Sequence, residues 1–163
     1  GQGYMLATPL QLANAAAALA TRGQRYKPML ISATENPING EKIITKSLEL
    51  NRIKVDSQSY WEEIISAMHN VMQGSGTAKN IGKDAPYKMA GKSGTVQVVS
   101  VGQEEEYDRE SLDERFQDHA VFVAFAPLNK PEIAVAVIVE NGNSGSRVAA
   151  PIAKSMMDEY LGY

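Results

Sequence analysis

The chain has 163 residues, enough for one domain or most of one, and 44% of them are apolar, which predicts a packed core rather than a disordered segment. Its formal net charge of −3 gives no basis for nucleic-acid binding, and the absence of cysteine excludes disulfides, a cysteine nucleophile and a zinc ribbon within these residues. No apolar run reaches the roughly 18 residues that a membrane span requires, and no signal peptide is apparent.

The first predicted helix covers residues 10–20. Thr8 can cap it, Pro9 suits the first helical position, and Gln11 completes a capping box. Most of its residues are alanine or leucine, so neighbouring elements can approach closely and we expect the helix to be buried. Gly23 is expected to close it, because glycine is favoured just beyond a helix C-terminus.

The segment after this helix carries weaker signals. Residues 26–34 are typical of an extended segment that Pro28 weakens, and residues 36–40 are typical of a turn. Residues 42–55 are ambiguous, and we interpret them as a short surface hairpin.

The second predicted helix starts at Ser59, which forms a capping-box pattern with Glu62. Apolar residues recur at helical spacing from Trp61 to Met72, and Gly74 is expected to end the helix.

The second half of the chain predicts three strands and a helix. One strand lies within residues 87–99 and ends in Val96-Gln97-Val98-Val99, and residues 120–125 and 133–139 form an antiparallel hairpin. The run at 134–139 is apolar throughout, so both of its faces should be covered. The last helix covers residues 148–161, with Pro151 in its first turn and Ile152, Met156 and Tyr160 on one face. This order predicts an α+β fold, a mostly antiparallel sheet covered by helices.

Residues 102–118 are strongly acidic, with eight acids and two bases, while the rest of the chain carries a net charge of +3. A charge run of this kind is typical of a solvated loop, and a contact surface for a partner is the alternative.

No pattern in the sequence indicates a metal site or a cofactor site. The only histidines, His69 and His119, are far apart, and each fits a structural or surface position better than a ligand position. No nucleophile elbow, P-loop or dinucleotide fingerprint is present. We therefore expect no metal and no cofactor.

The tetrapeptide Lys92-Ser93-Gly94-Thr95 stands inside a predicted strand, where glycine is unfavourable unless something must approach the backbone. Strand alternation places Lys92 and Gly94 on one face and Ser93 and Thr95 on the other. A cation and hydroxyls beside an open strand edge suit an anionic, peptide-like ligand that adds itself as a further strand. On these four residues alone, a chance glycine in an edge strand next to a solvated lysine is the favoured explanation.

The flanking sequence resembles class B penicillin-binding proteins. Residues 1–13 are similar to the segment that leads into a helix in this family, Gly76-Thr77-Ala78 matches its Gly-Thr-Ala loop, and residues 89–95 look like its Lys-Thr/Ser-Gly strand. Residues 118–127 resemble the following strand, and residues 150–153 the start of its last helix. The matches keep the family's order, span nearly the whole chain, and are most similar to the penicillin-binding protein 2 type, which acts in cell elongation.

This resemblance implies that residues 1–163 are the C-terminal portion of a single transpeptidase domain with the penicillin-binding protein and serine β-lactamase fold. It implies a serine-type D,D-transpeptidase, in which a serine attacks a D-alanyl-D-alanine stem peptide of peptidoglycan and β-lactams acylate the same serine. It also implies a bacterial periplasmic location, an inner-membrane anchor in the full-length protein, and work beside a membrane glycan polymerase.

The same resemblance assigns roles within the motif. Lys92 and Thr95 would be catalytic, through positive charge beside the nucleophile and a backbone N–H in the oxyanion hole. The Ser93 and Thr95 hydroxyls would bind the substrate carboxylate, and Gly94 would let the substrate lie close to the strand. The implied substrate-binding residues are Ser93, Gly94, Thr95, Val96 and Gln97.

Two family motifs are missing from the chain. No Ser-x-x-Lys occurs, since Lys79 stands one position too far from Ser75, and no Ser-x-Asn occurs. Because residue 1 is not Met, we expect the chain to begin inside a larger protein whose N-terminal portion carries the nucleophile, and we expect the chain alone to be inactive. Two alternatives remain: a non-catalytic peptidoglycan-peptide or protein-interaction module, and a serine β-lactamase relative, which the class B flanks disfavour.

Overall fold

A computed structural model describes residues 5–98, 113 and 116–163 of the chain. None of the helices within these residues is both long and apolar enough to cross a membrane. The elements are, in chain order, α1 (Pro9–Ala20), β1 (Arg25–Tyr26), β2 (Ala33–Glu35), β3 (Lys42–Ile44), β4 (Glu49–Leu50), α2 (Ser59–Asn70), α3 (Lys79–Lys83), β5 (Ala90–Val96), β6 (His119–Ala126), β7 (Ile133–Val139), the π-helical turn η3 (Gly145–Ala149) and α4 (Ala150–Leu161).

The body of the molecule is a three-stranded antiparallel sheet in the order β5-β6-β7. The predicted hairpin is confirmed: β6 and β7 pair from Ala120 with Val139 to Ala126 with Ile133. Because β5 pairs only with β6 within the described residues, its other edge is open. The predicted α+β fold with an antiparallel sheet is therefore confirmed.

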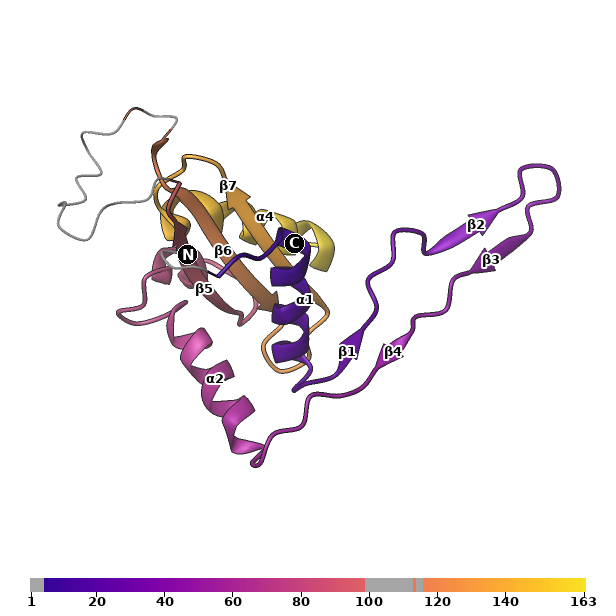
Figure 1. Cartoon of the computed structure of the whole chain (residues 1–163), viewed down its shortest axis with the longest axis horizontal. Coiled ribbons are helices and arrows are strands. Elements are labelled where there is room, and N and C mark those ends of the chain that lie inside the picture. Colours follow the sequence, from indigo (N-terminus) through magenta and orange to yellow (C-terminus); the bar gives the residue numbers. More distant parts are fainter. Residues whose placement is uncertain (1–4, 99–112, 114–115) are drawn as a thin grey trace.

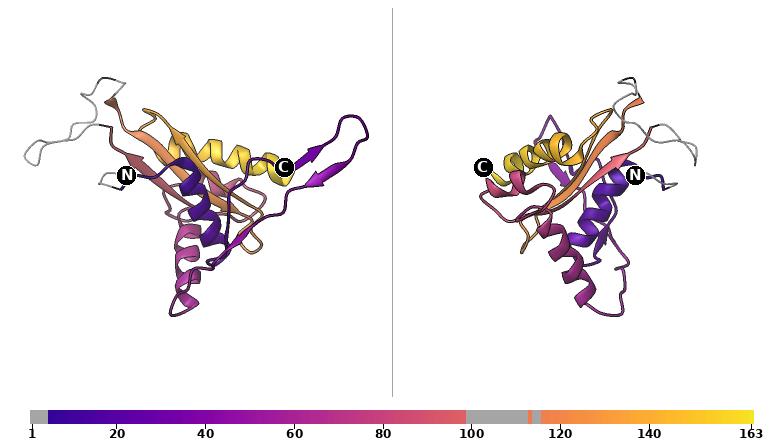
Figure 2. Two further views of the ribbon diagram at one scale, coloured as in Figure 1. Left: turned by 45° about the vertical axis from the view of Figure 1, so that its right-hand side comes forward. Right: turned by 90° about the vertical axis from the view of Figure 1, so that its left-hand side faces the viewer.

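Helices cover both faces of this sheet (Figures 1 and 2). On one face, Met157 of α4 packs in a cluster with Phe122 and Val137. On the other face, the ends of α1 and α2 pack against the sheet, where Ala20 and Ile65 belong to a second cluster with Phe125. Burying each phenylalanine side chain contributes about 1.5–3 kcal/mol. The apolar strand β7 lies between α1 and α4, as its unbroken apolar run predicts.

The predicted ends of α1 are confirmed. The Thr8 hydroxyl accepts a hydrogen bond from the Gln11 N–H at 3.2 Å, and the Gln11 amide oxygen accepts one from the Thr8 N–H at 2.8 Å, which completes the capping box. At the other end the Gly23 N–H donates to the Ala18 carbonyl at 2.7 Å, after Arg22 has turned to a φ of 55°.

The predicted capping box of α2 is wrong. Gln58 occupies the N-cap without a side-chain bond, and Ser59 is the first helical residue. Because Ser59 is not the N-cap, Glu62 is not three residues after the N-cap, and the Glu62 carboxylate instead forms a salt bridge with Arg22 at 2.5 Å. The helix also ends at Asn70, before the expected Gly74, and Gly74 instead lies in the turn that follows, with a φ of +57°.

Residues 25–50 form an arm that projects from the body (Figures 1 and 2). In it β1 pairs with β4, and β2 pairs with β3. The predicted turn at 36–40 is confirmed, since the Gly40 N–H donates to the Asn36 carbonyl at 2.9 Å. A hairpin confined to residues 42–55 is wrong, because this turn folds β3 and β4 back onto the preceding segment.

Several predicted boundaries move in the second half. Strand β5 ends at Val96, so Gln97 and Val98 lie beyond it, while residue 99 is outside the described residues. Most of the acidic segment 102–118 is outside them as well, so its interpretation stays a prediction. Helix α4 starts at Ala150 with Pro151 in its first turn, as expected, but only after η3. The residues expected to share one face are exposed: Ile152, Met156 and Tyr160.

A hydrogen-bonded group ties α4 to the loop before β5. The Tyr87 hydroxyl donates to one Asp158 carboxylate oxygen at 2.7 Å, and Lys154 contacts the other at 2.5 Å. Burial and the bond to Asp158 raise the pKa of Tyr87. Burial alone would raise the pKa of Asp158, but the bonds from Lys154 and Tyr87 outweigh it and lower that pKa below 3.8.

We therefore expect Asp158→Asn to lower the free energy of unfolding by about 1 kcal/mol at pH 7. Because the pKa of Asp158 is lower in the folded state, its stabilisation is complete above the unfolded value of 3.8 and is lost as the pH falls through the folded value. Urea unfolding at pH 7 and pH 3 should show the difference from the wild type shrinking at pH 3. The exposed neighbour Glu159, changed to Gln, is the control and should cost less than about 0.5 kcal/mol at either pH.

Candidate substrate-binding site

A pocket of about 430 Å³ opens beside the free edge of β5. Three segments form its wall: the turn after α2, strand β5 itself, and the connection from β7 into η3. All four motif residues line this pocket, together with residues from the other two segments. The lining residues are Thr77, Lys92, Ser93, Gly94, Thr95, Asn143, Ser144, Gly145, Ser146 and Arg147.

The strand register confirms the predicted division of the motif between two faces. Ser93 pairs with Phe122, whose side chain lies in the cluster under α4, so Ser93 and Thr95 face the side of η3 and α4. Lys92 and Gly94 face the opposite side, which α1 partly covers. The Lys92 ammonium donates to the Ser93 carbonyl at 2.6 Å, so it is held against its own strand.

Thr77 belongs to the site although the sequence analysis gave it no role. Its hydroxyl lies 3.4 Å from the Ser93 hydroxyl. The turn reaches β5 because Gly76 packs tightly on the end of α2: a Cβ at Gly76 would lie 2.2 Å from the Asn70 carbonyl oxygen. The match of Gly76-Thr77-Ala78 to a family loop was the signal that could have found this residue.

The η3 wall was not predicted either. Gly145 packs directly on the motif strand: a Cβ there would lie 2.7 Å from the Gly94 oxygen and 2.2 Å from the Val121 oxygen. This contact holds Ser146 and Arg147 at the pocket. No local sequence signal marks them, because the sheet brings them there from a distant part of the chain.

A second, apolar groove of about 390 Å³ borders the opposite face of β5. Val96 lines it, whereas Gln97 lies beyond the strand and lines neither pocket. The other apolar side chains around it come from the N-terminal segment and from the sheet: Met5, Leu6, Leu12, Val121, Val123 and Ile138.

Both histidines make a hydrogen-bond contact through Nδ1. His69 Nδ1 lies 2.7 Å from the Met89 carbonyl oxygen, and His119 Nδ1 accepts a hydrogen bond from the Asn141 N–H at 3.0 Å. Within the described ranges, no group of three or more histidine, aspartate or glutamate side chains could hold a metal ion.

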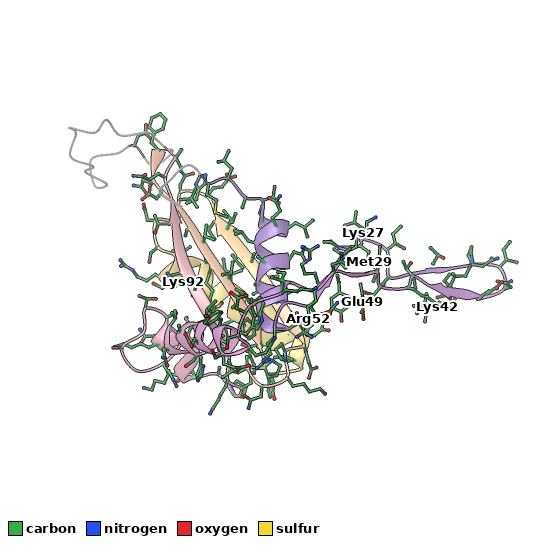
Figure 3. The ribbon with its side chains drawn as sticks, turned by 60° about the horizontal axis from the view of Figure 1, so that its bottom comes forward. Lys27, Met29, Lys42, Glu49, Arg52 and Lys92 are labelled. Atoms are coloured by element: carbon green, nitrogen blue, oxygen red, sulfur yellow. The ribbon has the colours of Figure 1, made fainter. Side chains whose placement is uncertain are left out.

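The arm is not part of the pocket. Figure 3 shows Lys27, Met29, Lys42 and Glu49 along the arm, and Lys92 on the sheet well away from them. The charges that matter at the pocket therefore come from the body.

The chemistry of the pocket is that of an anion-binding site. Five hydroxyl residues and two cations line it, and the described lining residues include neither a carboxylate nor a histidine that could serve as a general base. The pocket can hold a carboxylate and hydrogen-bond a peptide, but these residues do not form a nucleophile–base pair.

Comparisons with known proteins show what the chain as a whole is similar to. The family model of the penicillin-binding protein transpeptidase domain matches residues 1–158. The peptidoglycan D,D-transpeptidase MrdA of Haemophilus influenzae is 40% identical over 99% of the chain and 25% of its own length. The crystal structure of Pseudomonas aeruginosa penicillin-binding protein 2 in complex with WCK 5153 has a TM-score of 0.76 at 41% identity and covers 99% of this chain and 32% of that one. An imipenem acyl-enzyme complex of penicillin-binding protein A from Mycobacterium tuberculosis has a TM-score of 0.72 at 27% identity, covering 99% and 32%. The chain thus spans about a quarter of the curated relative and a third of the solved ones.

Proposed function

The chain belongs to the penicillin-binding protein transpeptidase family, in its penicillin-binding protein 2 type, and from this we propose that it supplies one wall of a peptidoglycan D,D-transpeptidase active site. The observation that carries the proposal is the pocket at the free edge of β5, where hydroxyls and two cations surround a glycine-containing strand. We propose that residues 1–163 form the C-terminal portion of a single transpeptidase domain.

In this proposal the stem peptide lies along β5 as an additional strand. The hydroxyls of Ser93 and Thr95 bind its terminal carboxylate, and Gly94 lets its backbone come close. The backbone N–H of Thr95 is one donor to the oxyanion that forms when the nucleophile attacks, an interaction typically worth about 3 kcal/mol. Val96 continues the edge for one more residue, and Gln97 follows it.

The attacking serine and its lysine stand on an N-terminal remainder of the domain, which is the first partner in this proposal. Two exposed apolar surfaces support it: the groove beside Lys92, and the α4 stripe formed by Ile152, Met156 and Tyr160. Contiguous exposed apolar surface commonly marks a place where another part of a protein packs. In the groove, Lys92 would then lie beside the serine.

The broader setting follows from the relatives. We propose that the complete protein is anchored in the inner membrane, acts in the bacterial periplasm on peptidoglycan stem peptides during cell elongation, is inhibited by β-lactams, and works beside a membrane glycan polymerase.

Labelling with a fluorescent penicillin tests the proposal. The complete protein, cleaved just before residue 1 after reaction, should carry the label on the N-terminal piece and none on the 163-residue piece. Denaturing gels separate the two. A label on the 163-residue piece would reveal a nucleophile within it, and no label on either piece would favour a non-catalytic module.

A further inference from the structure

The two cations of the pocket are not equivalent. Lys92 lies on the α1 face of β5, opposite the Ser93 and Thr95 hydroxyls, and its ammonium donates to the Ser93 carbonyl at 2.6 Å. Arg147 lies at the end of the pocket that η3 forms, on the face that carries the hydroxyls. The cation best placed to share a ligand with these hydroxyls is therefore Arg147.

The N–H donors of the Arg147 guanidinium are available to a ligand. Across residues 5–98, 113 and 116–163, no hydrogen bond or ion pair engages its side chain. A guanidinium matches a carboxylate with two parallel N–H donors, which an ammonium cannot do. The Ser93 and Thr95 hydroxyls on β5 would contact one side of a carboxylate, and the two parallel N–H groups of Arg147 on η3 would contact the other side.

Packing joins the backbone of the η3 turn to strand β5, while the Arg147 side chain itself is exposed. Gly145, in the same η3 turn, rests on the backbone of Gly94, where a Cβ would come within 2.7 Å of the Gly94 oxygen. The turn that carries Arg147 thus packs directly against the strand that carries the hydroxyls.

We propose that Arg147 is a specificity-determining residue that binds the carboxylate ending the stem peptide, or the equivalent carboxylate of a β-lactam, together with the hydroxyls of Ser93 and Thr95. This rests on the proposed function and adds to it a residue of the η3 turn that lies outside the Lys-Ser-Gly-Thr motif. Its role is to distinguish a ligand that ends in a free carboxylate from one that ends in a neutral group.

The test compares a penicillin with its methyl ester, which keeps the ring and lacks the negative charge. In the complete protein, Arg147→Gln should reduce the second-order rate constant of acylation by the free acid by about tenfold to a hundredfold, and should leave the rate for the ester within about twofold. Arg147→Lys should recover only part of the loss, because it restores charge without the bidentate geometry.

Lys130→Gln is the matched control. It removes the same charge from an exposed residue in the β6–β7 connection and should change neither rate. An equal loss with both ligands would overturn the inference by assigning Arg147 a structural role, and no loss with the free acid would overturn it as well. A wild-type protein that reacts with neither ligand would instead overturn the proposed function, and the inference with it.

Discussion

Lys92→Ala is expected to slow acylation of the complete protein by penicillin by about a hundredfold to a thousandfold. In the proposed arrangement the ammonium lies between the carboxylate pocket and the groove in which the N-terminal remainder packs. It is then the nearest positive charge to the nucleophile and to the charge that develops in the transition state. Time courses of fluorescent labelling, read as second-order rate constants, measure the effect.

Lys88→Ala provides the comparison. Lys88 is an exposed lysine just before the same strand. Its backbone carbonyl accepts a hydrogen bond from the Leu128 N–H at 2.8 Å, and a substitution of the side chain leaves this bond in place. Its removal should leave the rate within about twofold and the free energy of unfolding within about 0.5 kcal/mol. If Lys92→Ala reacted as fast as Lys88→Ala, Lys92 would have no place in the site.

The sequence predicted those elements whose signals are local. The Thr8 capping box joins residues three apart in the sequence, so it could be predicted without knowledge of the fold. The same holds for β6 and β7, because both are apolar runs and a short turn segment connects them. The Ser59 box failed because the helix takes Gln58 as its N-cap, and Glu62 pairs instead with Arg22 from the end of another helix. A local pattern cannot report such a competing partner.

The residues of the candidate site also differ in whether a local sequence signal marks them. Lys92 to Thr95 were singled out because a glycine within a β-rich run is locally unusual, but only the family resemblance of the flanking segments assigned them a role. Thr77 could be found only through the family match of Gly76-Thr77-Ala78, and Arg147 could not be predicted at all, because η3 reaches the pocket only after it packs on the sheet. The face of α4 shows a further limit: helical spacing grouped Ile152 with Met156, but the face that packs is that of Ala153 and Met157.

Gly145→Ala is expected to lower the free energy of unfolding by about 2–3 kcal/mol. The added methyl would lie 2.2 Å from the Val121 oxygen, 2.7 Å from the Gly94 oxygen and 3.0 Å from the Gly94 nitrogen. All three are backbone atoms of paired strands, so they cannot turn aside as the end of a side chain could. The η3 turn must move away from β5, which also widens the pocket. The variant should therefore unfold at a lower urea concentration than the wild type, and it should be acylated by penicillin more slowly.

Gly94→Ala separates packing from ligand access. A Cβ at Gly94 meets the Val121 side chain at 3.5 Å, an ordinary contact, so stability should change by less than about 1 kcal/mol. Acylation should still fall by about tenfold or more, because the methyl stands where a ligand strand must approach the backbone. Equal stability of the two variants would show that η3 can shift freely on the sheet. Normal acylation of Gly94→Ala would show that the ligand does not lie along β5.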